Sequence, residues 1–172
     1  MYKIINPKGI SLYFVGNGAS VIFSGKKSLP VKIRVDSSNG DYTQEDILKI
    51  DGFNILDSQI ISNRMKELIN KYTLQGDIEY IKIKLILDGV ILKNDYYAMN
   101  IKSTQRVSIL TASETDWVPD ARYVVKNSQP IHDIFIDSEL KFPVLSNSIV
   151  DYFNANKLKL TFHKYEILES LE

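Results

Sequence analysis

The strongest constraint on the fold of this chain is a pattern that occurs twice, 84 residues apart. A pair of apolar residues precedes Ser-Asn, and apolar residues follow at helical spacing, first in "IISNRMKELI" and later in "VLSNSIVDYF". A serine directly before such a run is typical of a helix N-cap, because its hydroxyl accepts a hydrogen bond from an unpaired backbone N–H. The pattern therefore predicts two helices, which begin after Ser62 and Ser146.

Each predicted helix has one apolar face and leads into an extended segment. The faces comprise Met65, Leu68, Ile69 and Tyr72 in the first helix, and Ile149, Tyr152 and Phe153 in the second. The segments that follow, 78–87 and 157–167, alternate apolar and polar residues as half-buried strands do. The unit that recurs is thus an extended apolar pair, a capped helix and a strand.

The first 40 residues predict a β-hairpin region. Residues 11–15 and 20–24 flank Gly16-Asn17-Gly18, which can supply the positive-φ residues of a tight turn. Residues 31–35 alternate apolar and basic side chains, as a strand with one buried face does. Thr43 then stands three residues before Asp46, a spacing that resembles a capping box and predicts a short helix.

Further strands are expected in "YYAMNIK", "ARYVV" and "HDIFID". A chain of 172 residues without a low-complexity linker has the length of one domain. We therefore predict a single α+β domain over residues 1–172, with a mostly antiparallel sheet and two to three helices. Residues 1–40 form the N-terminal hairpin region in this prediction, and residues 41–172 form the main body.

Charge and composition restrict the expected partners. The 21 basic and 21 acidic residues leave no net charge, whereas binding to nucleic acid needs a surplus of cations. The absence of cysteine excludes disulfides and thiolate metal sites. No apolar run approaches the roughly 20 residues of a membrane span. We expect a cytoplasmic protein that binds neither nucleic acid nor membrane.

Motifs for catalysis or cofactor binding are not apparent. His132 and His163 are the only imidazoles, and they lie far apart without further residues at metal-ligand spacing. The chain has no Gly-x-Ser-x-Gly elbow, and "GNG" is too short for a loop that holds phosphate. The sequence therefore predicts no catalytic residue, no metal and no cofactor.

An acidic segment at residues 111–120 contains the only tryptophan. Residues 111–139 carry six carboxylates against two basic side chains, a net charge of −4. Trp117 is either a core or edge anchor, or the centre of a protein-binding patch, since tryptophan contributes much of the energy at interfaces. Its acidic surroundings suit a basic partner. We take a partner-binding patch as the prediction, formed by Glu114, Asp116, Trp117 and Asp120.

The order of these motifs resembles immunity proteins of bacterial polymorphic toxin systems. The resemblance covers roughly residues 50–165 and includes "IISNRMKELI", "IEYIKIKLIL", "YYAMNI", "IFID" and "FPVLSNSIVDYF". In that group we would expect a glycine between the last helix and the last strand, where this chain has "NANKLK". The resemblance implies a non-catalytic protein that binds one cognate toxin, often a basic protein, and neutralises it.

Two alternatives remain open at the level of sequence. The chain is alternatively a small enzyme or ligand-binding domain, with a pocket against the sheet and Tyr96, Tyr97 or His132 as its polar groups. It is alternatively a homo-oligomeric module joined through "KLKLTFHKY", although the alternating lysines of that segment oppose edge pairing.

Overall fold

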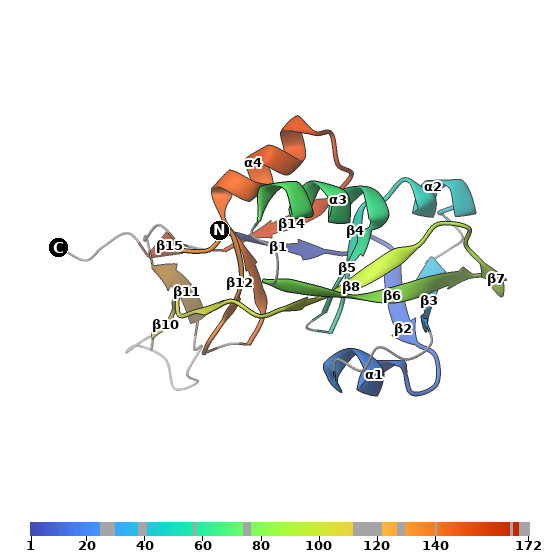
Figure 1. Cartoon of the computed structure of the whole chain (residues 1–172), viewed down its shortest axis with the longest axis horizontal. Coiled ribbons are helices and arrows are strands. Elements are labelled where there is room, and N and C mark those ends of the chain that lie inside the picture. Colours follow the sequence, from blue (N-terminus) through green and yellow to red (C-terminus); the bar gives the residue numbers. More distant parts are fainter. Residues whose placement is uncertain are drawn as a thin grey trace.

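The computed structural model describes residues 1–24, 30–37, 41–56, 58–73, 77–111, 122–126, 130–139, 141–165 and 167–168. It shows an α+β fold with mostly antiparallel sheets, as predicted (Figure 1). Three of the helices are those expected from the sequence: α2 (Gln44–Leu48), α3 (Asn63–Tyr72) and α4 (Asn147–Ala155).

Capping explains where these three helices begin. Thr43 and Asp46 form a reciprocal capping box, in which each side chain accepts a hydrogen bond from the other residue's backbone N–H. Ser62 Oγ accepts from the N–H of Met65 at 3.1 Å, and Ser146 Oγ accepts from that of Ile149 at 3.2 Å. The predicted N-caps are therefore confirmed.

The N-terminal hairpin prediction is wrong in its second strand. After β2 (Ile10–Phe14), residues 18–24 form helix α1 (Gly18–Ser24), and β2 pairs instead with β3 (Val31–Ser37). The chain leaves the sheet at Gly16, whose φ is +63°. It then passes so close to β3 that a Cβ on Gly18 would lie 2.8 Å from Val31 Cγ1. Strand β3, in which buried and exposed residues alternate, takes the sheet position beside β2.

Most of the remaining chain forms two sheets. The larger has the order β2-β3-β6-β8-β5-β4, and β7 (Val90–Ile91) pairs with β6. The smaller has the order β14-β1-β13-β12-β9. The strands named here for the first time are β1 (Tyr2–Ile5), β4 (Gly52–Ile55), β5 (Ser58–Ser62), β6 (Ile78–Leu87), β8 (Tyr96–Ile101), β9 (Thr104–Gln105), β12 (Ile134–Asp137), β13 (Pro143–Leu145) and β14 (Thr161–Lys164).

A third group of strands consists of β10 (Ser108–Thr111), β11 (Arg122–Lys126) and β15 (Ile167–Leu168). Strands β10 and β11 are antiparallel, whereas β11 and β15 are parallel. The other parallel pairs are β3 with β6 and β12 with β9. Antiparallel pairing therefore predominates, as the sequence predicted.

The recurring sequence pattern corresponds to a recurring arrangement in space. In the first unit, hairpin β4–β5 leads through α3 to β6, and β8 lies between β5 and β6. In the second unit, hairpin β12–β13 leads through α4 to β14, and β1 lies between β13 and β14. Each central strand is antiparallel to both of its neighbours. The second unit thus obtains its central strand from the opposite end of the sequence.

The registers of the two hairpins also correspond. Phe53 pairs with Ile60 in the first hairpin, and Phe135 pairs with Val144 in the second. All four side chains are buried. The extended apolar pairs before Ser62 and Ser146 therefore enter the core, as expected.

The two units share one hydrophobic cluster, which lies around α3 and α4. Helices α3 and α4 lie side by side on the same side of the sheets (Figure 1), and the rings of Tyr72 and Tyr152 are 4.8 Å apart. Met65 and Ile69 of α3 belong to the same buried cluster as Phe153 of α4. Packing across this cluster holds the units together.

The last predicted strand is shorter than expected. Only residues 161–164 form β14, whereas alternation in the sequence extends from 157 to 167. Lys157 adopts a left-handed conformation with φ 54°, and the N–H of Leu158 donates to the carbonyl of Phe153. Residues 158–160 then contact the first unit before the strand begins, because Lys159 pairs with Asp51.

Candidate functional site at the junction of the two units

The partner-binding patch predicted from the sequence lies outside the described residues. Glu114, Asp116, Trp117 and Asp120 all fall within 112–121. Partner binding by these four residues therefore stays a prediction.

Two of the residues proposed for a pocket against the sheet, Tyr96 and Tyr97, are not brought together, and the third, His132, is a half-buried residue just before β12. Tyr96 is buried, and its hydroxyl donates to the carbonyls of Ile47 and Ile50, each at 3.2 Å. Burial raises the pKa of Tyr96, so its phenol stays protonated. This tyrosine ties β8 to α2.

Tyr97 faces the opposite side of the same strand. Tyr96 packs in the cluster around Phe53, whereas Tyr97 packs against the cluster around Met65. The ammonium group of Lys66 lies 3.8 Å from the centre of the Tyr97 ring, a cation–π contact. Adjacent residues of a strand point to opposite faces, so the two tyrosines cannot line one pocket.

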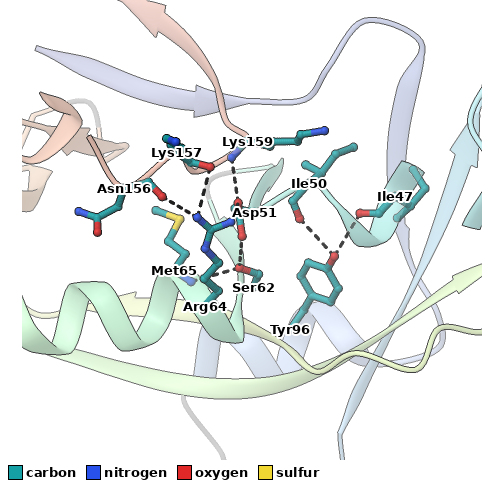
Figure 2. Close-up of polar contacts among 10 residues, drawn as sticks. All are labelled: Ile47, Ile50, Asp51, Ser62, Arg64, Met65, Tyr96, Asn156, Lys157 and Lys159. Carbon is teal, nitrogen blue, oxygen red and sulfur yellow. Dashed lines mark hydrogen bonds and ion pairs between the residues drawn. The ribbon is translucent and has the colours of Figure 1, made fainter. Parts of the chain in front are cut away.

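Asp51, directly before β4, connects the two units through both its side chain and its backbone. Its side chain is buried, and it accepts hydrogen bonds from Ser62 Oγ at 2.6 Å and from the N–H of Lys159 at 2.8 Å (Figure 2). Its own N–H donates to the carbonyl of Lys159, and its carbonyl accepts from the N–H of Ser62. One aspartate therefore joins the start of α3 to the segment after α4.

Arg64 extends this connection. Its Nη1 lies 3.8 Å from Asp51 Oδ2, and its Nη2 donates to the carbonyls of Asn156 at 2.5 Å and Lys157 at 3.3 Å (Figure 2). Those carbonyls follow the C-terminal end of α4, where a cation is favourable because of the helix dipole. A side chain of the first unit thus caps a helix of the second.

The second unit has an equivalent aspartate. Ser146 Oγ donates to Asp133 Oδ1, and the N–H of Ser146 donates to the Asp133 carbonyl at 2.9 Å. Asp133 lies close to Tyr72 of α3, in the first unit. Burial, and then the negative charge of Asp133, raise the pKa of Tyr72. The predictions from sequence missed this pair of aspartates. The sequence feature that could have revealed them is an aspartate 11 residues before Ser62 and another 13 residues before Ser146.

An open pocket of about 560 Å³ lies beside Asp51, where the two units meet. Five cationic side chains line it: Lys49, Arg64, Lys93, Lys157 and Lys159. It also contains the carboxylates of Asp51 and Asp95. We call this space the junction pocket. A wider groove of about 1170 Å³ shares Lys49 and Lys159 with it.

Both carboxylates of the junction pocket already have partners. Asp51 is held by Ser62 and by the backbone of Lys159. Asp95 forms ion pairs with Lys82, 2.7 Å away, and with Lys84. Hydrogen bonds from Lys82 and then Lys84 hold the pKa of Asp95 below its usual value, so it is ionised at neutral pH. The pocket therefore presents mainly positive charge.

The part of the chain that the structure describes has neither a metal-ligand cluster nor a membrane-spanning helix. Within the described ranges, no three His, Asp or Glu side chains are grouped so that they could hold a metal ion. None of the helices in the same ranges is long and apolar enough to cross a membrane.

No protein-family model matches the chain, and no curated protein matches its sequence.

Proposed function

We propose that the chain is a non-catalytic immunity protein that binds and neutralises a cognate bacterial toxin. One observation carries this proposal: three buried side chains of types that serve in catalysis, those of Asp51, Ser146 and Asp137, accept hydrogen bonds from backbone N–H groups and so stabilise the fold. Asp51 and Ser146 hold helix starts and hairpins, and Asp137 accepts hydrogen bonds from the N–H groups of Val107 and Glu139. Such a frame suits a protein whose function depends on the shape of its surface.

The shared core of the two units supports the same role. A tight inhibitor gains affinity when its binding surface is rigid before the encounter, because little entropy is then lost on binding. Helices α3 and α4 pack on each other, and Arg64 and Asp51 connect the units at their junction. The acidic segment with Trp117 supplies the contact chemistry in this proposal: an aromatic anchor among charges that attract a basic toxin.

Co-expression with the protein encoded by the neighbouring gene tests the function. We expect a stable complex on co-purification, and restored growth of cells in which that neighbour alone is toxic. Failure of both, with each protein soluble and folded, would contradict the neutralising role.

Alanine variants test the location of the interface. Trp117→Ala and Asp116→Ala are expected to weaken the complex at least tenfold, the effect of losing an interface anchor or a charge pair. Tyr13→Ala serves as the control, because Tyr13 is an exposed aromatic residue on β2 outside the acidic segment. An unchanged dissociation constant for Trp117→Ala would remove the site assignment while leaving the function intact.

A further inference from the structure

The residues that line the junction pocket carry an excess of positive charge. Five cationic residues stand against two carboxylates, a net charge of +3 for the lining, and Lys49 also lies 3.9 Å from Asp46, a carboxylate outside the lining. The two carboxylates are bound within the protein, and Asp95 is paired with Lys82 and Lys84, which lie outside the pocket lining. Within the described residues, Lys93 and Lys157 have no ion-pair partner.

The cations come from four separate parts of the chain. Lys49 follows α2, Arg64 lies in the first turn of α3, and Lys93 lies between β7 and β8. Lys157 and Lys159 belong to the segment between α4 and β14. No stretch of sequence is rich in lysine at this site, so the tertiary structure concentrates the charge.

Lys157 has a backbone conformation that a glycine would adopt at a lower conformational energy. Its φ of 54° is left-handed, a conformation that is unfavourable for a residue with a Cβ by about 1 kcal/mol. The side chain is exposed, so it does not repay this cost by packing in the core. The left-handed turn closes the C-terminal end of α4, where the N–H of Leu158 donates to the carbonyl of Phe153, and it leaves Lys157 exposed on the rim of the junction pocket.

We propose that the junction pocket binds a small phosphate-bearing ligand. A net charge of +3 matches a di- or triphosphate better than a single carboxylate, and lysine ammonium groups bind phosphate as point charges. The volume of about 560 Å³ lies within the range of small-molecule sites, about 300–1,000 Å³. The start of α3 faces the pocket and adds a smaller contribution of the same sign. This site does not depend on the neutralising role proposed above.

Titration with pyrophosphate, followed by ¹⁵N NMR at constant ionic strength, tests the proposal. We expect saturable shifts at Arg64, Lys93 and Lys157, and only small, unsaturated shifts with sodium chloride. A parallel titration with a nucleoside diphosphate identifies the ligand class. Equal affinity means that the diphosphate alone is recognised, and at least tenfold tighter binding indicates a nucleotide. No saturable binding by either probe would overturn the site.

A pair of glycine variants separates binding from folding. Lys157→Gly removes the ammonium group and relieves the backbone, so we expect at least tenfold weaker pyrophosphate binding with an unchanged or higher melting temperature. Lys141→Gly is the matched control, because Lys141 also has a left-handed φ, 60°, but does not line the pocket. It should gain stability and bind pyrophosphate like the parent. Equal binding by Lys157→Gly and the parent would overturn the proposal, as would an Asp/Glu-rich peptide that binds the pocket more tightly than pyrophosphate does.

Discussion

Ser62 and Ser146 each perform two tasks with one hydroxyl. The oxygen accepts a hydrogen bond from the first turn of a helix, and the proton is donated to an aspartate at the start of the preceding hairpin. The N-cap therefore marks the start of the helix and also connects the helix to the sheet. A single residue fixes the direction in which α3 or α4 leaves its hairpin.

Replacing Ser62 by alanine removes both interactions. We expect the free energy of unfolding to fall by about 2 kcal/mol, because the cap is lost and the buried carboxylate of Asp51 loses a donor. Urea denaturation of the variant and the parent measures the difference. Ser11→Ala, at an exposed position of β2, is the control and should change stability by less than about 0.5 kcal/mol. A loss of similar size in both variants would contradict the double role of Ser62.

At the scale of elements, side chains of the sheet hold helices and turns in place. The hydroxyl of Tyr96 on β8 binds two carbonyls near the C-terminal end of α2. On the neighbouring strand, Lys82 and Lys84 of β6 both reach Asp95, which directly precedes β8. These contacts position the wall of the junction pocket, since Asp95 and Lys49 both line it.

Tyr96→Phe tests the link between β8 and α2. The change removes only the hydroxyl, so we expect a loss of about 1 kcal/mol together with faster amide hydrogen exchange at residues 47–50. Tyr97→Phe is the matched control on the other face of the strand, and its exchange in α2 should equal that of the parent. Unchanged protection of α2 in Tyr96→Phe would show that the two hydrogen bonds do not hold the helix.

The pairing of Asp95 with two lysines predicts a pH dependence. Because the folded pKa of Asp95 is lowered, its stabilising effect is present above the usual value of 3.8 and is lost as the pH falls through the folded pKa. We expect Asp95→Asn to lower stability by about 0.5 kcal/mol at pH 7, since the pair is partly exposed, and by less at pH 3.

Urea denaturation at both pH values measures this effect, with Asp151→Asn as the control. Asp151 is an exposed residue of α4, so its replacement should have little effect at either pH. A stability difference between Asp95→Asn and the parent that grows as the pH falls would contradict the lowered pKa of Asp95.

At the scale of the whole molecule, the two units are interdependent. They share the cluster between α3 and α4, and β1 is the central strand of the second unit although it precedes the first in sequence. Ile4 of β1 is fully buried within that cluster. Neither unit is therefore complete without residues from beyond its own continuous segment.

Deleting residues 1–9 tests this interdependence. Because β13 and β14 would lose their common neighbour and Ile4 would leave a cavity, we expect the free energy of unfolding to fall by at least about 3 kcal/mol. A synthetic peptide of residues 1–9, added in trans, should restore the native NMR spectrum. The same peptide with Ile4→Asp should not. A deleted chain with native stability would show that β1 is dispensable.

The amino-acid sequence by itself determined the local features. Thr43, Ser62 and Ser146 cap helices through bonds that span three residues, and the alternation in 31–35 and 78–87 marks strands regardless of their partners. Such signals depend on neighbours in the chain, so they can be read from the sequence without a structure. The α+β class and the positions of three helices follow from them.

Only the tertiary structure decided which strands pair and where charge collects. Residues 20–24 fold as a helix because β3 takes the place beside β2, which no local pattern reveals. Strand β1 lies between β13 and β14, and Asp51 binds a residue 108 positions away. The junction pocket likewise assembles lysines from separate segments of the chain. Contacts of this kind depend on the packing of the whole chain, because they stabilise the fold only after segments distant in the sequence have come together.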